Sequence, residues 1–103
     1  MAYIPVAQVT EIAPGQVKIV EAVGQKIALS NVGGTVYAIE DRCSHDNGPL
    51  GEGTLQGKLL ECPRHGARFD VTTGRPVTLP AVVPVKQFPV KIEGNQILVE
   101  VAP

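Results

Sequence analysis

The sequence predicts an all-β protein, and three observations support this fold class. Apolar, β-branched runs are short and alternate with turn signals along most of the chain. The 103 residues include 11 glycines and 9 prolines, which is typical of a turn-rich protein. No segment with helical periodicity extends beyond about ten residues without Gly or Pro.

Glycine-containing dipeptides mark three hairpins, since such pairs favour the tight turns that join antiparallel strands. The expected hairpins, given as strand, turn and strand, are 16–23, Gly24-Gln25 and 26–32; 26–32, Gly33-Gly34 and 35–40; and 90–93, Gly94-Asn95 and 96–101.

A shorter hairpin is expected between 54–56 and 58–61, around Gly57. It would bring Cys43 and Cys62 together in space. Residues 76–89 are too rich in proline for a central strand, because proline cannot donate to a sheet. We expect them to form an ordered connection back to the last hairpin.

Size and charge restrict the class of protein. The length fits one domain over residues 1–103. Nine basic against ten acidic residues give a net charge of −1, which argues against nucleic acid or a membrane surface as a partner. The N-terminal residues lack a basic and an apolar region of the kind found in export signals, so a cytoplasmic location is expected.

All cysteines and histidines of the chain fall into two short segments. They are Cys43, His45, Cys62 and His65, so that each segment supplies one thiol and one imidazole. Because cysteine and histidine are the common ligands of transition metals, this paired arrangement predicts a metal site. Glycines and prolines beside both segments indicate tight loops that present ligands from two sides.

Other interpretations of these four residues stay open at this point. A buried cysteine often packs as a small apolar residue, and a single histidine is commonly a surface residue. A disulfide between Cys43 and Cys62 would explain the two cysteines but neither histidine. A structural zinc site with two cysteines and two histidines is a further alternative, although zinc fingers commonly use other spacings.

The spacing C-x-H-x16-C-x2-H, here Cys43 and His45 followed by Cys62 and His65, resembles the signature of Rieske [2Fe-2S] proteins. The resemblance implies one [2Fe-2S] cluster, with Cys43 and Cys62 on one iron and His45 and His65 on the other. It also implies an antiparallel β sandwich or barrel with a small subdomain whose two cluster-binding loops lie within about residues 41–70. The segment around Leu79-Pro80-Ala81 would form a third loop over the cluster.

Two departures place the chain within the family. Respiratory Rieske proteins have an additional cysteine in each loop, which this chain lacks, and hydroxyl side chains where this chain has Ala67 and Phe69. Without those hydroxyl donors we expect a potential near the low end of the family's range, about −150 mV. The resemblance is therefore to ferredoxins of aromatic-ring dioxygenase systems.

The expected function is one-electron transfer without substrate chemistry. The resemblance implies an NAD(P)H-dependent ferredoxin reductase as electron donor and a terminal oxygenase, or a similar protein, as acceptor. The alternatives are the small subunit of a nitrite-reductase-like enzyme and the structural zinc module. Charged residues around the loops, Asp41 and Asp70 among them, are expected to form a solvated mixed surface.

Overall fold

The computed structural model describes residues 2–42, 48–63, 66–79 and 83–101. Within these ranges the chain forms β-strands and two short 3-10 helices, as predicted for an all-β protein. The elements in order are β1 (Ala2–Gln8), η1 (Val9–Glu11), β2 (Val17–Ala22), β3 (Gln25–Val32), β4 (Thr35–Glu40), η2 (Leu50–Glu52), β5 (Thr54–Gln56), β6 (Leu59–Glu61), β7 (Arg68–Asp70), β8 (Arg75–Pro76), β9 (Gln87–Phe88), β10 (Val90–Glu93) and β11 (Gln96–Val101).

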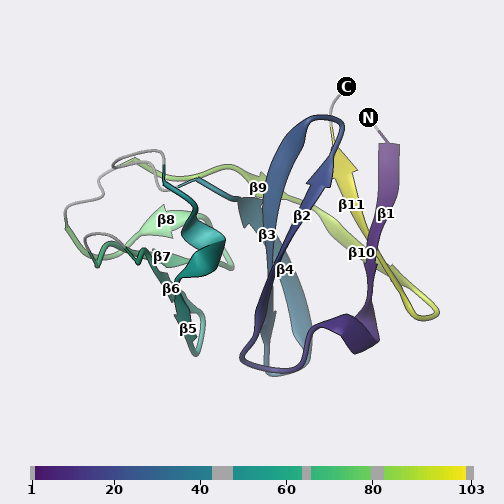
Figure 1. The fold of residues 1–103 in the computed structure, drawn as a ribbon, viewed down its shortest axis with the longest axis horizontal. Helices are drawn as coiled ribbons and strands as arrows, with labels where there is room; N and C mark the ends of the chain where they lie inside the picture. Colours follow the sequence, from purple (N-terminus) through teal and green to yellow (C-terminus); the bar gives the residue numbers. More distant parts are fainter. Residues whose placement is uncertain (1, 43–47, 64–65, 80–82, 102–103) are drawn as a thin grey trace.

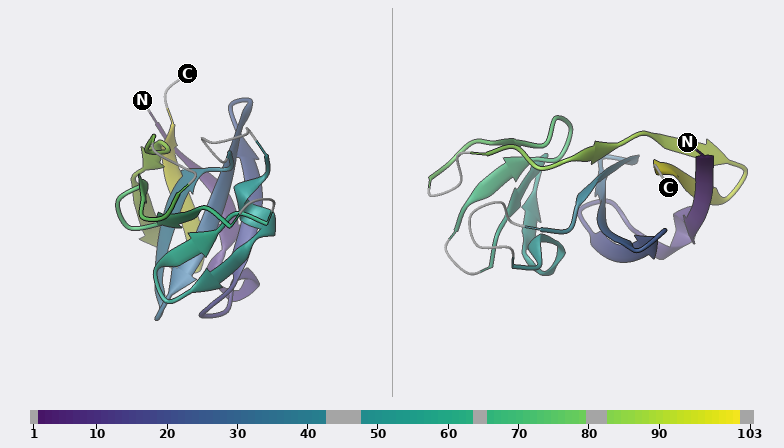
Figure 2. Two further views of the ribbon diagram at one scale, coloured as in Figure 1. Left: turned by 90° about the vertical axis from the view of Figure 1, so that its left-hand side faces the viewer. Right: turned by 90° about the horizontal axis from the view of Figure 1, so that it is seen from above.

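The strands form three antiparallel sheets (Figure 1). The first sheet has the order β1-β11-β10, the second β2-β3-β4-β9 and the third β5-β6-β7-β8. The first two sheets pack together as the larger body, and the third forms a small lobe beside it (Figure 2). We call this third sheet with η2 the small lobe. An antiparallel β sandwich or barrel with a small subdomain is the predicted architecture.

The second sheet is the middle layer, because both of its faces are buried. Ile27 and Leu29 of β3 face a core shared with Ile97 and Val99 of β11. Ala28, which points to the opposite face, packs in a second core with Phe69 of the small lobe. This two-sided burial explains why β3 is apolar without the strict alternation of a half-exposed strand.

Glycine turns define the registers of the hairpins. Gly33 and Gly34 both have positive φ angles and join β3 to β4 as predicted, with Val32 opposite Thr35. The turn at Gly94 likewise places Glu93 opposite Gln96. At the small hairpin the turn comprises Gly57 and Lys58, so β6 begins at Leu59, one residue later than predicted.

The prediction for the first hairpin is wrong by one residue. The turn comprises Val23 and Gly24, not Gly24 and Gln25, because Ala22 pairs with Gln25. Val23 adopts a φ of 51°, which is rare for a β-branched residue. The local preference of glycine for turns predicts a turn at Gly24 and Gln25. The pairing of β2 with β3 along their full length instead places the turn at Val23 and Gly24.

Two pairings come from parts of the chain without a strong strand pattern. β1 pairs with β11 although it contains Pro5; it is an edge strand, and its register shifts between Pro5 and Ala7. Within the predicted connection 76–89, the described residues include β9, which pairs with β4 at the edge of the second sheet. Pro80 and Ala81, predicted as part of a third loop, lie outside the described residues.

Candidate metal centre

Cys62 occupies the start of a hairpin tip in the small lobe. β6 and β7 pair with Glu61 opposite Arg68, and the chain between them carries the second predicted ligand segment. The Cys62 N–H donates to the Ala67 carbonyl at 2.7 Å, and the Gly66 N–H donates to the Cys62 carbonyl at 3.2 Å. These bonds fix the backbone of Cys62 at the tip.

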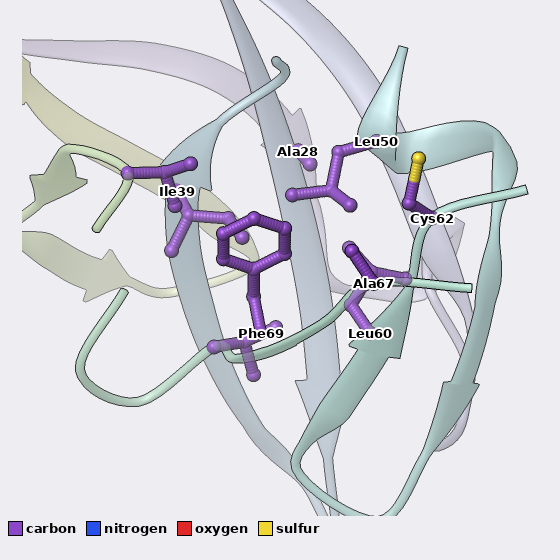
Figure 3. Close-up of a cluster of buried hydrophobic side chains, with 9 residues drawn as sticks. Ala28, Ile39, Leu50, Leu60, Cys62, Ala67 and Phe69 are labelled. Atoms are coloured by element: carbon purple, nitrogen blue, oxygen red, sulfur yellow. The ribbon is translucent and has the colours of Figure 1, made fainter. Parts of the chain in front are cut away.

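The side chain of Cys62 is buried in an apolar environment. It is 1% exposed and belongs to the same core as Leu50, Leu60 and Ala67. Figure 3 shows Cys62 at one end of this group, beside Leu50 and across from Ile39. Cys62 is a free cysteine. A soft sulfur donor held rigidly at a hairpin tip fits a thiolate ligand of an iron–sulfur cluster.

The other three predicted ligands, Cys43, His45 and His65, lie outside the described residues. Accordingly, the described ranges contain no group of three or more His, Cys, Asp or Glu side chains able to hold a metal ion. The described chain does show where both ligand segments leave and re-enter the fold. The first spans from the end of β4 to η2, and the second joins β6 to β7.

The helix η2, which follows the first ligand segment, packs against the start of the second ligand segment. Leu50 of η2 is fully buried in the core that contains Cys62. A side chain on Gly53 would overlap the backbone carbonyl of Glu61, the residue before Cys62. The end of one ligand segment and the start of the other are therefore in direct backbone contact.

Two carboxylates near the site are buried, which corrects the prediction of a solvated surface for them. Asp41 is 9% exposed and Asp70 is 8% exposed. Asp41 Oδ1 accepts the Gly51 N–H at 2.6 Å. The sequence offers only a weak signal that these two aspartates are buried, because a single aspartate beside a loop is also typical of an exposed turn.

Asp70 is stabilised in its charged form by partners at the end of β7. Burial alone would raise the pKa of the Asp70 carboxyl above 3.8, but hydrogen bonds from the Thr72 hydroxyl, the Thr72 N–H and Lys58 outweigh burial and lower it. The Lys58 Nζ lies 3.2 Å from Asp70 Oδ2. Asp70 thus ties the turn after β7 to the turn between β5 and β6.

Comparison with known proteins gives a consistent result. The family model for the Rieske [2Fe-2S] domain matches residues 2–89. The chain is 40% identical over 100 residues to the ferredoxin component of biphenyl 2,3-dioxygenase from Rhodococcus jostii (strain RHA1), covering 97% of this chain and 94% of that protein. It is 39% identical over 92 residues to the ferredoxin component of the naphthalene 1,2-dioxygenase system from Pseudomonas aeruginosa, covering 89% and 88%.

A solved structure has the same fold. A chain in the complex of reduced oxygenase and oxidized ferredoxin of carbazole 1,9a-dioxygenase superposes with a TM-score of 0.90 at 38% identity. The match covers 94% of this chain and 91% of that chain. The architecture of three antiparallel sheets, with a cysteine at a hairpin tip of the small lobe, is therefore that of a small iron–sulfur electron carrier.

The chain belongs to the Rieske [2Fe-2S] domain family. It is an electron carrier of the ferredoxin type with one Rieske cluster, and not itself a catalytic enzyme. When bound, such a cluster accepts and releases a single electron. The family match favours this cluster over the structural zinc site, which was the alternative from the sequence. No helix of the described ranges is long and apolar enough to cross a membrane.

Proposed function

We propose that this protein carries single electrons from an NAD(P)H-dependent ferredoxin reductase to the terminal oxygenase of an aromatic-ring dioxygenase system. In this proposal Cys43 and Cys62 bind one iron and His45 and His65 the other. The observation that carries the ligand assignment is the free, buried Cys62 at the β6–β7 tip, three residues before His65 in the matching motif. The dioxygenase ferredoxins among the relatives support the choice of partners.

The mixed ligand set has a direct electrostatic consequence. Two neutral imidazoles in place of two thiolates make the oxidised cluster with its ligands neutral overall, where four thiolates would give it a charge of 2−. Adding an electron is then more favourable, so the potential lies above that of plant-type ferredoxins at about −400 mV. We also propose a cytoplasmic location, because thiol ligands stay reduced there.

Exposed apolar side chains lie next to the β6–β7 tip that carries Cys62. The Thr78 hydroxyl accepts the Arg68 N–H at 2.8 Å and lies 3.5 Å from the Gly66 carbonyl, which ties this part of the connection to the β6–β7 tip. Its neighbours Val77 and Leu79 are 49% and 78% exposed. Apolar residues beside a redox centre suit transient docking with the terminal oxygenase.

The first test is electron paramagnetic resonance of the anaerobic, dithionite-reduced protein together with iron and zinc analysis. We expect two irons per chain and a rhombic signal whose average g value is below that of all-cysteine clusters. Zinc without a signal would contradict the proposal. Cys62→Ser, compared with the distant control Ala22→Ser, should lose most of the iron while the control retains it.

The second test addresses the partners. Reduced protein is mixed anaerobically with an aromatic-ring oxygenase, and oxidation of the ferredoxin is followed by its visible spectrum. Leu79→Gln should slow this step without changing the midpoint potential. Stable co-purification with a large nitrite-reductase-like subunit, and no transfer to the oxygenase, would favour the alternative function.

A further inference from the structure

The first ligand segment is closed at its base by one side chain. Asp41 follows the last residue of β4, and its N–H donates to the Lys26 carbonyl at 3.0 Å. Its carboxylate then accepts the N–H of Gly51, ten residues later, at 2.6 Å. One residue thus joins the strand before the segment to the helix after it.

Gly51 allows this contact because it has no side chain. A Cβ at position 51 would lie 2.6 Å from Ile19 Cγ1 of β2 and 3.0 Å from Asp41 Oδ1. The backbone of η2 therefore lies directly against β2 and against the Asp41 carboxylate. The neighbouring Leu50 side chain is fully buried, which leaves η2 little freedom to shift.

The same short helix also reaches the second ligand segment. Gly53 caps η2 through its N–H to the Leu50 carbonyl at 3.0 Å, and it packs against the Glu61 carbonyl. Glu61 immediately precedes Cys62. A continuous path of contacts therefore leads from the Asp41 carboxylate through Gly51 and Gly53 to Glu61, the residue before Cys62.

We propose that Asp41 is a positioning residue for the cluster: its carboxylate holds the two ends of the first ligand segment at a set separation and in register with Cys62. The inference rests on the ligand assignment proposed above. Asp41 acts by placing its acceptor oxygen, Oδ1, opposite the N–H of Gly51. The geometry of the side chain therefore matters, and its charge does not. Asparagine retains an oxygen at the same position, whereas glutamate moves the carboxylate outward by one methylene.

The test compares Asp41→Ala, Asp41→Asn and Asp41→Glu with wild type. The readouts are the line shape of the reduced paramagnetic resonance spectrum and the rate at which iron passes to a ferrous chelator. We expect Asp41→Ala and Asp41→Glu to release iron about tenfold faster, equivalent to about 1.4 kcal/mol, and to shift or broaden the spectrum. Asp41→Asn should match wild type in both.

Asn31→Ala is the matched control. Asn31 is also buried at 7%, and its Oδ1 also accepts a glycine N–H, that of Gly34 at 2.8 Å, but it lies in the β3–β4 hairpin. This variant should unfold more easily while its spectrum is unchanged. Equal iron-release rates in Asp41→Ala and Asn31→Ala, with unchanged spectra in both, would refute the inference.

The remaining outcomes are also decisive. If Asp41→Ala does not fold, the comparison of Asp41→Asn with Asp41→Glu decides: wild-type behaviour of asparagine and fast release from glutamate support the inference, and equally fast release from both contradicts it. A wild-type protein without a Rieske signal would overturn the proposed function and the inference together. A wild-type signal with an unaffected Asp41→Ala would overturn the inference alone.

Discussion

The backbone carbonyl of Glu61 occupies the space that a side chain on Gly53 would need. Gly53 has φ −82° and ψ −165°, a conformation open to any residue, so only this close approach requires glycine. The contact joins the end of η2 to the strand that leads into Cys62. It is the point where the two ligand segments are brought together by backbone packing.

Gly53→Ala should therefore destabilise the protein by about 1–3 kcal/mol through overpacking alone. The measurement is the midpoint of urea unfolding, with the visible spectrum as a second signal for loss of the cluster. Gly94→Ala is the control, because a Cβ there has open space and only the positive φ of 61° is unfavourable. We expect Gly53→Ala to lose its cluster at lower urea than Gly94→Ala does. The reverse order would show that the backbone at Gly53 adjusts without cost.

Asp70 should give stability that depends on pH. Its pKa is lowered below 3.8 despite burial, because Thr72 and Lys58 stabilise the carboxylate. A lowered pKa means that the stabilisation is fully present above 3.8 and disappears as the pH falls through the lower value in the folded protein. Asp70→Asn should therefore be less stable than wild type by about 1–2 kcal/mol at neutral pH. This difference should shrink below pH 3.8.

The comparison of Asp70→Asn with wild type removes effects common to both proteins, such as acid loss of the cluster. Lys58→Met serves as a partial variant, since it removes one exposed partner and leaves the two bonds from Thr72. A difference between Asp70→Asn and wild type that stayed constant into acid would argue against a lowered pKa.

Ser30 carries a buried hydroxyl without a hydrogen-bond partner in the part of the chain that the structure describes. It lies in β3, between Val17 and Tyr37 of the neighbouring strands. Burying an unpaired hydroxyl costs about 1–3 kcal/mol, so Ser30→Ala should raise the free energy of unfolding by about 1 kcal/mol. Thermal and urea unfolding both measure this. A loss of stability would show that a buried water satisfies the hydroxyl.

The potential should respond to hydroxyl groups at positions 67 and 69. Both side chains are fully buried in the core that includes Cys62, and the Ala67 carbonyl accepts the Cys62 N–H. The double variant Ala67→Ser with Phe69→Tyr should raise the midpoint potential by about 100–200 mV, if its hydroxyls donate to the cluster. Protein-film voltammetry measures the shift, and Ala22→Ser in the other core is the control. An unchanged potential would mean that these hydroxyls do not reach the cluster.

Local sequence features were sufficient where the chemistry is local. The spacing of Cys43, His45, Cys62 and His65 predicts the family, because the types of ligand and their separation are written in the chain itself. The turns at Gly33 and Gly94 were predicted for the same reason, since a positive φ is favourable for glycine at any place in a fold.

Only the tertiary structure determined the contacts between distant segments. The pairing of β1 with β11, the turn at Val23 and the burial of Asp41 each depend on partners that local preference does not identify. Val23 accepts an unfavourable φ because the full register of β2 with β3 outweighs the local cost. The sequence by itself thus determined the family and predicts which residues bind the cluster. Long-range packing decided how the described ends of the ligand segments are held, because the free energy of burial depends on neighbours far away in the chain.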